Sequence, residues 1–193
     1  VEVGCGAGGG SFELSKSVGR VIALDASKYF LDSASAMSRD GMVTVECPLS
    51  GGSSMTQEAT LDKGVESTRI TFRQCDPMCL PAGLADLDAV LIHSVIDAVP
   101  SPTTLLARMG GTRGLVKRNG GIVVIVSSYD WNEETTPRGA WLCGYLDDSA
   151  KGISRALGND FKLIHVEQVP RMKALAGRTF EYSLAEATVW RRD

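Results

Sequence analysis

The chain opens with VEVGCGAGGG, residues 1–10, in which a short apolar segment with one acid runs directly into glycines. Glycines in such a loop let the backbone approach a ligand closely, and a helix that follows the loop presents its free N–H groups. The segment therefore predicts a buried strand end, a ligand-binding turn and a helix over residues 11–18. Ser11 is suited to cap that helix.

The spacing of the glycines leaves two ligands open. Gly4, Gly6 and Gly8 form GxGxG, whereas Gly4, Gly6 and Gly9 form the GxGxxG of dinucleotide-binding proteins. Glu2 completes the pattern ExGxGxG, which is typical of S-adenosylmethionine-dependent methyltransferases. A carboxylate at that position suits a ligand with an ammonium and a sulfonium better than it suits a pyrophosphate.

Two further acids lie at predicted strand ends. Asp25 follows Gly6 by 19 residues and ends the second predicted strand, where a carboxylate can accept hydrogen bonds from both ribose hydroxyls. Asp76 ends the third, where methyltransferases of this kind bind the adenine amino group. Both acids favour an adenosine-containing ligand.

The rest of the chain alternates between strand and helix patterns. Predicted strands span residues 20–25, 68–73, 87–93, 122–126, 161–169 and 179–190, and predicted helices span 27–38, 102–116 and 141–157. This order predicts an α/β, Rossmann-like fold: a mostly parallel sheet with helices on both faces and an antiparallel C-terminal strand pair. We expect one domain over residues 1–193, with a flexible insertion at 46–67 and a loop at 170–178.

Composition excludes several classes of protein. The 193 residues are 44% hydrophobic and 22% charged with a net charge of −3, which favours neither nucleic-acid binding nor membrane insertion. The five cysteines and two histidines have no zinc-ligand spacing, so we expect free thiols, no metal and a reducing, cytoplasmic compartment. Cys75 and Cys143 are expected to be packed thiols. Because the chain starts inside a strand and without Met, we expect a truncated N-terminus.

Three segments resemble one particular family. They are residues 72–84 (FRQCDPMCLPAGL), 127–141 (SSYDWNEETTPRGAW) and 180–192 (FEYSLAEATVWRR). They are similar to the methyltransferase domain of ovothiol biosynthesis, which N-methylates 5-thiohistidine (4-mercaptohistidine) and is found at the C-terminus of the sulfoxide synthase that makes it. The resemblance covers essentially the whole chain, with departures at His93, Ser94, Ser128 and Tyr182.

The resemblance implies S-adenosylmethionine as cofactor, a small amino-acid substrate and N-methylation of its imidazole, with a sulfoxide synthase as a linked partner. Tyr129 and His93 are the candidate catalytic residues. The expected cofactor-binding residues are Glu2, Gly4, Gly6, Gly8, Asp25, Ala26, Cys75, Asp76 and His93. The expected substrate-binding residues are Tyr129, Trp131, Glu133, Glu134, Arg178 and Tyr182.

Each substrate-binding residue has an expected role. Tyr129 is suited to hydrogen-bond the substrate ring and Trp131 to stack on it. Glu133 or Glu134 is suited to hold an ammonium. Arg178 and Tyr182 are suited to meet a carboxylate or to cover the ring.

Two other functions compete with this interpretation. An NAD(P)-dependent oxidoreductase would fit the GxGxxG spacing, although the chain has no Tyr-x-x-x-Lys pair for proton relay. A non-catalytic S-adenosylmethionine-binding module would fit the departures at His93, Ser128 and Tyr182. Binding without methyl transfer would distinguish the module from an enzyme.

Overall fold

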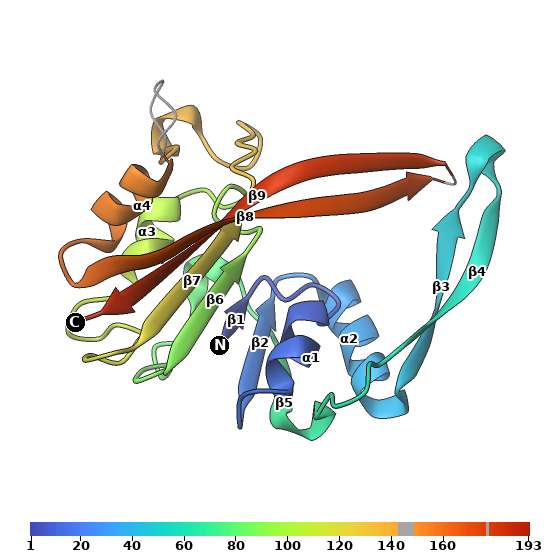
Figure 1. The fold of residues 1–193 in the computed structure, drawn as a ribbon, viewed down its shortest axis with the longest axis horizontal. Helices are drawn as coiled ribbons and strands as arrows, with labels where there is room; N and C mark the ends of the chain where they lie inside the picture. Colours follow the sequence, from blue (N-terminus) through green and yellow to red (C-terminus); the bar gives the residue numbers. More distant parts are fainter. Residues whose placement is uncertain (143–148, 177) are drawn as a thin grey trace.

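The computed structural model describes residues 1–142, 149–176 and 178–193, and its centre is a seven-stranded sheet. The strand order is β5-β2-β1-β6-β7-β9-β8. The first five strands in this order are parallel, and β9 runs antiparallel to both β7 and β8 (Figure 1). The expected mostly parallel sheet with an antiparallel C-terminal pair is confirmed.

The sheet consists of β1 (Glu2–Val3), β2 (Val21–Asp25), β5 (Ile70–Gln74), β6 (Ala89–His93), β7 (Ile122–Ser127), β8 (Phe161–Ala176) and β9 (Thr179–Arg192). The helices are α1 (Gly9–Ser15), α2 (Lys28–Asp40), α3 (Pro102–Ala107) and α4 (Ser149–Leu157). A separate two-stranded sheet pairs β3 (Met42–Pro48) with β4 (Ser54–Thr60). Among the described residues, no helix combines the length and the apolar character needed to cross a membrane.

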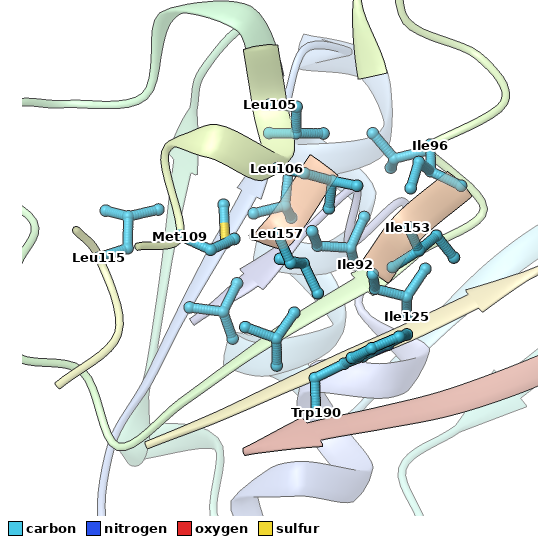
Figure 2. Close-up of a cluster of buried hydrophobic side chains, with 14 of the residues drawn as sticks. Ile92, Ile96, Leu105, Leu106, Met109, Leu115, Ile125, Ile153, Leu157 and Trp190 are labelled. Atoms are coloured by element: carbon cyan, nitrogen blue, oxygen red, sulfur yellow. The ribbon is translucent and has the colours of Figure 1, made fainter. Parts of the chain in front are cut away.

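The alternation of side chains along β2 separates two layers. Ala23 packs on one face with Leu31 of α2, while Leu24 belongs to the main core on the other face. That main core lies between the sheet and the helices α3 and α4, where Ile92, Ile125 and Trp190 meet leucines of both helices (Figure 2). Helices therefore cover both faces, as the strand–helix order predicts.

Helix boundaries differ in detail from the expectations. Helix α1 begins at Gly9 and its N-cap is Gly8, with φ of 92°, so Ser11 is not the cap but a buried residue of the first turn. Ser27 does cap α2, since its side chain accepts a hydrogen bond from the Phe30 N–H. The helix expected over 102–116 ends at Ala107. Residues 143–148, including Cys143, lie outside the described residues.

The stretch expected to be a flexible insertion contains part of a β-hairpin. Strands β3 and β4 pair in register from Met42–Thr60 to Pro48–Ser54, and Gly51 and Gly52 make the turn with φ of 77° and 76°. The Ser-Gly tract that suggested a loop is therefore the hairpin turn, because only glycine adopts this left-handed backbone without strain.

The C-terminal hairpin is longer than expected. Strand β8 continues to Ala176, so residues 170–176, predicted as loop, are paired with β9. Within β9, only Glu186–Arg191 pair with β7, so the part of β9 before Glu186 extends past the carboxyl end of β7. This extended part of the β8–β9 hairpin reaches toward the hairpin formed by β3 and β4, and β8 contacts β3 (Figure 1). We call paired residues 170–176 and 179–184 the distal hairpin.

Candidate functional site

The glycine loop joins β1 to α1 in a backbone conformation that requires glycine. Gly4, Gly6 and Gly8 have φ of 80°, 51° and 92°, values that residues with a Cβ rarely adopt. A Cβ on Gly8 would lie 2.9 Å from the Phe12 ring and 3.1 Å from the Phe72 ring. A Cβ on Gly4 would collide with Val95, just after β6, so the loop packs directly against the neighbouring strand end.

Asp25 holds this loop to the end of β2. Its Oδ2 accepts a hydrogen bond from the Gly6 N–H at 2.8 Å, and its Oδ1 accepts one from the Ser27 N–H at 2.8 Å. A carboxylate has about four acceptor positions, so both oxygens keep capacity for a ligand. Asp25 is thus at the glycine loop, where the sequence predicts it.

Glu2 lies beneath the loop instead of facing outward from it. The side chain is 1% exposed, accepts a hydrogen bond from the Ser11 hydroxyl, and packs so closely on Gly10 that a Cβ there would collide with it. Burial raises the pKa of Glu2, although the hydrogen bond from Ser11 acts in the opposite sense. Its visible role is to anchor α1 to β1.

The other predicted cofactor-binding residues follow β2 and β5. The Cys75 N–H donates to the Asp25 carbonyl at 2.8 Å, and the Ala26 carbonyl accepts from the Gln74 side chain at 2.9 Å. The Asp76 carboxylate accepts from the Met78 N–H at 2.8 Å, capping a short turn. These contacts align the ends of β2 and β5 beside the loop.

His93 ends β6 and is partly buried. Burial lowers its pKa, and the positive charge of Arg171 lowers it further, so both causes favour the neutral form of the imidazole. The next residue, Ser94, has φ of 54° and its hydroxyl accepts a hydrogen bond from an Arg171 Nη at 2.8 Å. Strand β8 thereby contacts the strand end on which the glycine loop packs.

A hydrogen-bonded network shapes the loop after β7. The buried Asp97 carboxylate accepts from the Ser127 hydroxyl at 2.8 Å and from the Asp130 N–H at 3.1 Å. Ser127 Oγ accepts from the Tyr129 N–H at 2.9 Å, and the Tyr129 hydroxyl donates to Glu186 at 3.1 Å. Tyr129 is held with φ of 53°, a strained value of the kind found at functional sites.

A pocket of about 640 Å³ opens between this loop and the distal hairpin. Its volume is in the range of small-molecule sites. The lining residues are Ser128, Tyr129, Asp130, Arg171, Met172, Lys173, Glu181, Ser183 and Leu184. Of the predicted substrate-binding residues, only Tyr129 is among them.

The remaining predicted substrate-binding residues lie elsewhere. Trp131 stacks on Trp141, and its buried Nε1 has no hydrogen-bond partner in the part of the chain that the structure describes. Glu133 and Glu134 are exposed, and Glu133 is 3.7 Å from Arg138. Arg178 is exposed near the hairpin turn. The structure does not bring these four residues into the pocket.

Tyr182 is separated from the pocket by strand geometry. It pairs with Met172 and is 70% exposed, while its neighbours Glu181 and Ser183 line the pocket. Successive side chains of a strand point to opposite faces, so Tyr182 lies opposite to Glu181 and Ser183, on what we call the outer face of the distal hairpin. Met172 and Leu184 of the same face also border the pocket, whereas Tyr182 does not.

Six polar pocket residues were not among the predicted site residues: Ser128, Asp130, Arg171, Lys173, Glu181 and Ser183. The last four lie on the distal hairpin. Residues 170–178 were interpreted as a loop, and in the strand predicted over 179–190 only Tyr182 was assigned to the substrate site. The sequence does contain a pattern that indicates a polar strand face: polar residues alternate as Arg-x-Lys on one strand and as Glu-x-Ser on the other. Within the described ranges, no three His, Cys, Asp or Glu side chains group as metal ligands would.

Comparisons with known proteins bear on this arrangement. A family model described as "Methyltransferase domain" matches residues 1–125. No curated protein matches the chain. Among solved structures, a SAM-dependent methyltransferase from Methanosarcina mazei has a TM-score of 0.58 at 16% identity, over 99% of this chain and 90% of that one.

Two further solved structures are similar. One comes from a study of the conversion of a disulfide bond into a thioacetal group during echinomycin biosynthesis (TM-score 0.61, 16% identity, 100% of this chain and 74% of that one). Another is the magnesium protoporphyrin IX methyltransferase of Synechocystis with bound SAM (TM-score 0.58, 14% identity, 100% and 68%). At these identities the likeness concerns the fold.

The glycine loop fits the cofactor of this family. A Cβ on Gly6 would meet nothing within 4 Å, so the backbone there is open to a ligand, and Asp25 lies beside it with acceptor capacity left. The family match covers the loop and both strand ends, and it decides between the two glycine spacings. This chain belongs to the methyltransferase family and uses S-adenosylmethionine as its cofactor.

Proposed function

We propose that this chain N-methylates the imidazole of 5-thiohistidine in ovothiol biosynthesis. The observation that carries the proposal is the composition of the pocket. Ser128, Tyr129 and Asp130 come from the second of the three segments that resemble the ovothiol methyltransferase domain, and Glu181, Ser183 and Leu184 come from the third. The two most specific parts of the resemblance thus meet in one pocket.

The cofactor site is expected to involve the glycine loop and Asp25. When bound, S-adenosylmethionine supplies an electrophilic methyl group on a positively charged sulfur. The protein then needs mainly to hold an acceptor nitrogen in line with that methyl group, because correct positioning alone is worth effective molarities of about 10⁵ M or more. An imidazole that has lost its proton is a competent nucleophile near neutral pH.

The residues near the pocket suit an imidazole acceptor. The Tyr129 hydroxyl, already engaged with Glu186, can present a polar contact that selects one ring tautomer. Burial and the charge of Arg171 lower the pKa of His93, which favours the neutral form of this second imidazole at the end of β6. Tyr129 and His93 are therefore the proposed catalytic residues, and Glu2, Asp76 and Cys75 support the cofactor site through the strand ends.

The setting of the reaction is part of the proposal. An amino-acid thiol as substrate requires a reaction that installs sulfur on histidine, and a sulfoxide synthase is the proposed partner. Cys5, Cys47, Cys75 and Cys79 are free thiols, which supports a reducing, cytoplasmic location.

The test is a methyl-transfer assay with S-adenosylmethionine and 5-thiohistidine, followed by mass spectrometry. We expect a product heavier by one methylene, and fragmentation places it on a ring nitrogen. S-adenosylhomocysteine binding is measured in parallel by thermal shift. Cofactor binding with no methylated thiohistidine would contradict the proposed substrate, and binding with no transfer to any imidazole would favour a non-catalytic module.

A further inference from the structure

One face of the distal hairpin carries four polar residues. Arg171 pairs with Ser183 and Lys173 pairs with Glu181 across the two strands, and all four line the pocket. Residues two apart on a strand share a face, and directly opposed residues have Cβ atoms about 4.5–5.5 Å apart. Two cations and one acid are therefore concentrated on a small surface, and Asp130 faces it from the loop after β7.

These charged side chains do not form ion pairs with one another. Lys173 and Glu181 are directly opposed, yet in the described parts of the chain neither takes part in an ion pair. Arg171 also forms no ion pair with any described residue. Asp130 forms a hydrogen bond through its backbone N–H, and its carboxylate has no hydrogen-bond or ion-pair partner among the described residues. The pocket thus holds two positive and two negative groups with free bonding capacity.

Arg171 is the most constrained of the four. One Nη donates to Ser94 Oγ at 2.8 Å, which fixes the guanidinium at the end of β6 beside His93. A guanidinium has five N–H donors, so most of them remain for a ligand. A planar fork of donors held in this way matches a carboxylate bidentately.

We propose that this pocket is a binding site for a zwitterionic α-amino acid, in which Arg171, assisted by Lys173, binds the α-carboxylate, and Asp130 and Glu181 bind the α-ammonium. A simple anion would meet two unfavourable carboxylates, and a simple cation would meet Arg171 and Lys173. A zwitterion satisfies both pairs at once. The inference rests on the proposed function and deepens it by naming the residues that bind the α-carboxylate and the α-ammonium of the methyl acceptor.

The first experiment compares ligands on the wild-type protein loaded with S-adenosylhomocysteine. Isothermal titration calorimetry is run with 5-thiohistidine, L-histidine, histamine, which lacks the carboxylate, and imidazole propionate, which lacks the ammonium. We expect both amino acids to bind about 10- to 100-fold more tightly than either truncated analogue, as charge-assisted hydrogen bonds predict. Equal affinity for L-histidine and histamine would overturn the proposal.

The second experiment uses matched variants. Arg171→Gln is expected to weaken amino-acid binding about 10- to 100-fold and leave histamine binding unchanged, while Arg171→Lys, which keeps the charge but loses the fork, is intermediate. Arg191→Gln is the control, because Arg191 is an exposed arginine at the other end of the same hairpin, near Asp193. S-adenosylhomocysteine binding reports that each variant is folded.

The outcomes separate the two proposals. Arg171-dependent amino-acid binding without methylation of 5-thiohistidine would support the site and contradict the proposed reaction. Methylation of 5-thiohistidine with an unchanged KM in Arg171→Gln would support the reaction and overturn the site. Binding of no amino acid at millimolar concentration would also overturn the site.

Discussion

Side chains alternate between two faces both in the body of the sheet and in the distal hairpin, but the face directed inward is apolar in the body and charged in the distal hairpin. In the body, β7 and β9 direct Val123, Ile125 and Trp190 into the core beneath α3 and α4 (Figure 2). In the distal hairpin, the charged face lines the pocket, and the alternate positions carry exposed apolar side chains: Met172, Phe180, Tyr182 and Leu184. Of these four, Met172 and Leu184 also border the pocket, whereas Phe180 and Tyr182 do not. A period of two identifies a strand, but what packs against it decides which face is buried.

The largest expected effect lies in the body. Trp190 is 2% exposed, and Trp190→Ala should lower the free energy of unfolding by about 3–5 kcal/mol through the cavity it leaves. Phe180→Ala on the outer face of the distal hairpin, where the ring is 55% exposed, should change it by less than about 0.5 kcal/mol. Urea denaturation of both variants checks this, and similar losses would mean that the outer face is a second core.

Much of this contrast could be predicted from sequence, and part could not. Strong apolar runs such as residues 122–126 identified the parallel strands, and ExGxGxG correctly predicted a glycine loop between a strand and a helix, with Asp25 beside it. The distal hairpin was missed because Arg171 and Lys173 look like loop residues unless the partner strand is known. Tyr182 was expected at the substrate because it flanks the final strand pair, whereas in the structure its neighbours Glu181 and Ser183 line the pocket.

The next largest effect is expected for a substitution beside the glycine loop. Asp25→Ala removes the acceptor of the Gly6 and Ser27 N–H groups and a predicted ligand of the ribose, so we expect S-adenosylhomocysteine to bind about 10- to 100-fold more weakly. Asp32→Ala is the control, because the ion pair of Asp32 with Lys28 on α2 is exposed to solvent. Calorimetric Kd values that are equal for the two variants would remove Asp25 from the site.

Glycine geometry gives a finer test of the same loop. Gly8→Ala places a Cβ against Phe12 and Phe72 at φ of 92°, which should cost about 1–2 kcal/mol of stability and weaken cofactor binding. Gly9→Ala adds the same methyl group where nothing lies within 4 Å, and it should be tolerated. Melting temperatures with and without S-adenosylhomocysteine distinguish the two, and an unaffected Gly8→Ala would show that the loop is not held as described.

The smallest effect concerns the buried acid beneath the loop. Because burial raises the pKa of Glu2 in the folded protein, the folded state binds a proton more readily than the unfolded state. This contribution to stability is present below the ordinary glutamate pKa and is lost as pH rises through the raised pKa. The free energy of unfolding of the wild type should therefore fall across that window relative to Glu2→Gln.

Denaturant midpoints at stepped pH values measure this difference. Glu58→Gln, at an exposed position on β4, is the control and should follow the wild type. A wild-type free energy of unfolding that instead rises with pH relative to that of Glu2→Gln would mean that the Glu2 carboxylate is stabilised as an anion.

The most direct test of the contrast between the two faces uses adjacent residues, Glu181 on the inner face and Phe180 on the outer face of the distal hairpin. The measurement is the KM for 5-thiohistidine at saturating S-adenosylmethionine in Glu181→Gln and Phe180→Ala. We predict that Glu181→Gln raises KM about tenfold while Phe180→Ala matches the wild type. A raised KM in Phe180→Ala with an unchanged value in Glu181→Gln would contradict the assignment of the charged face as the acceptor site.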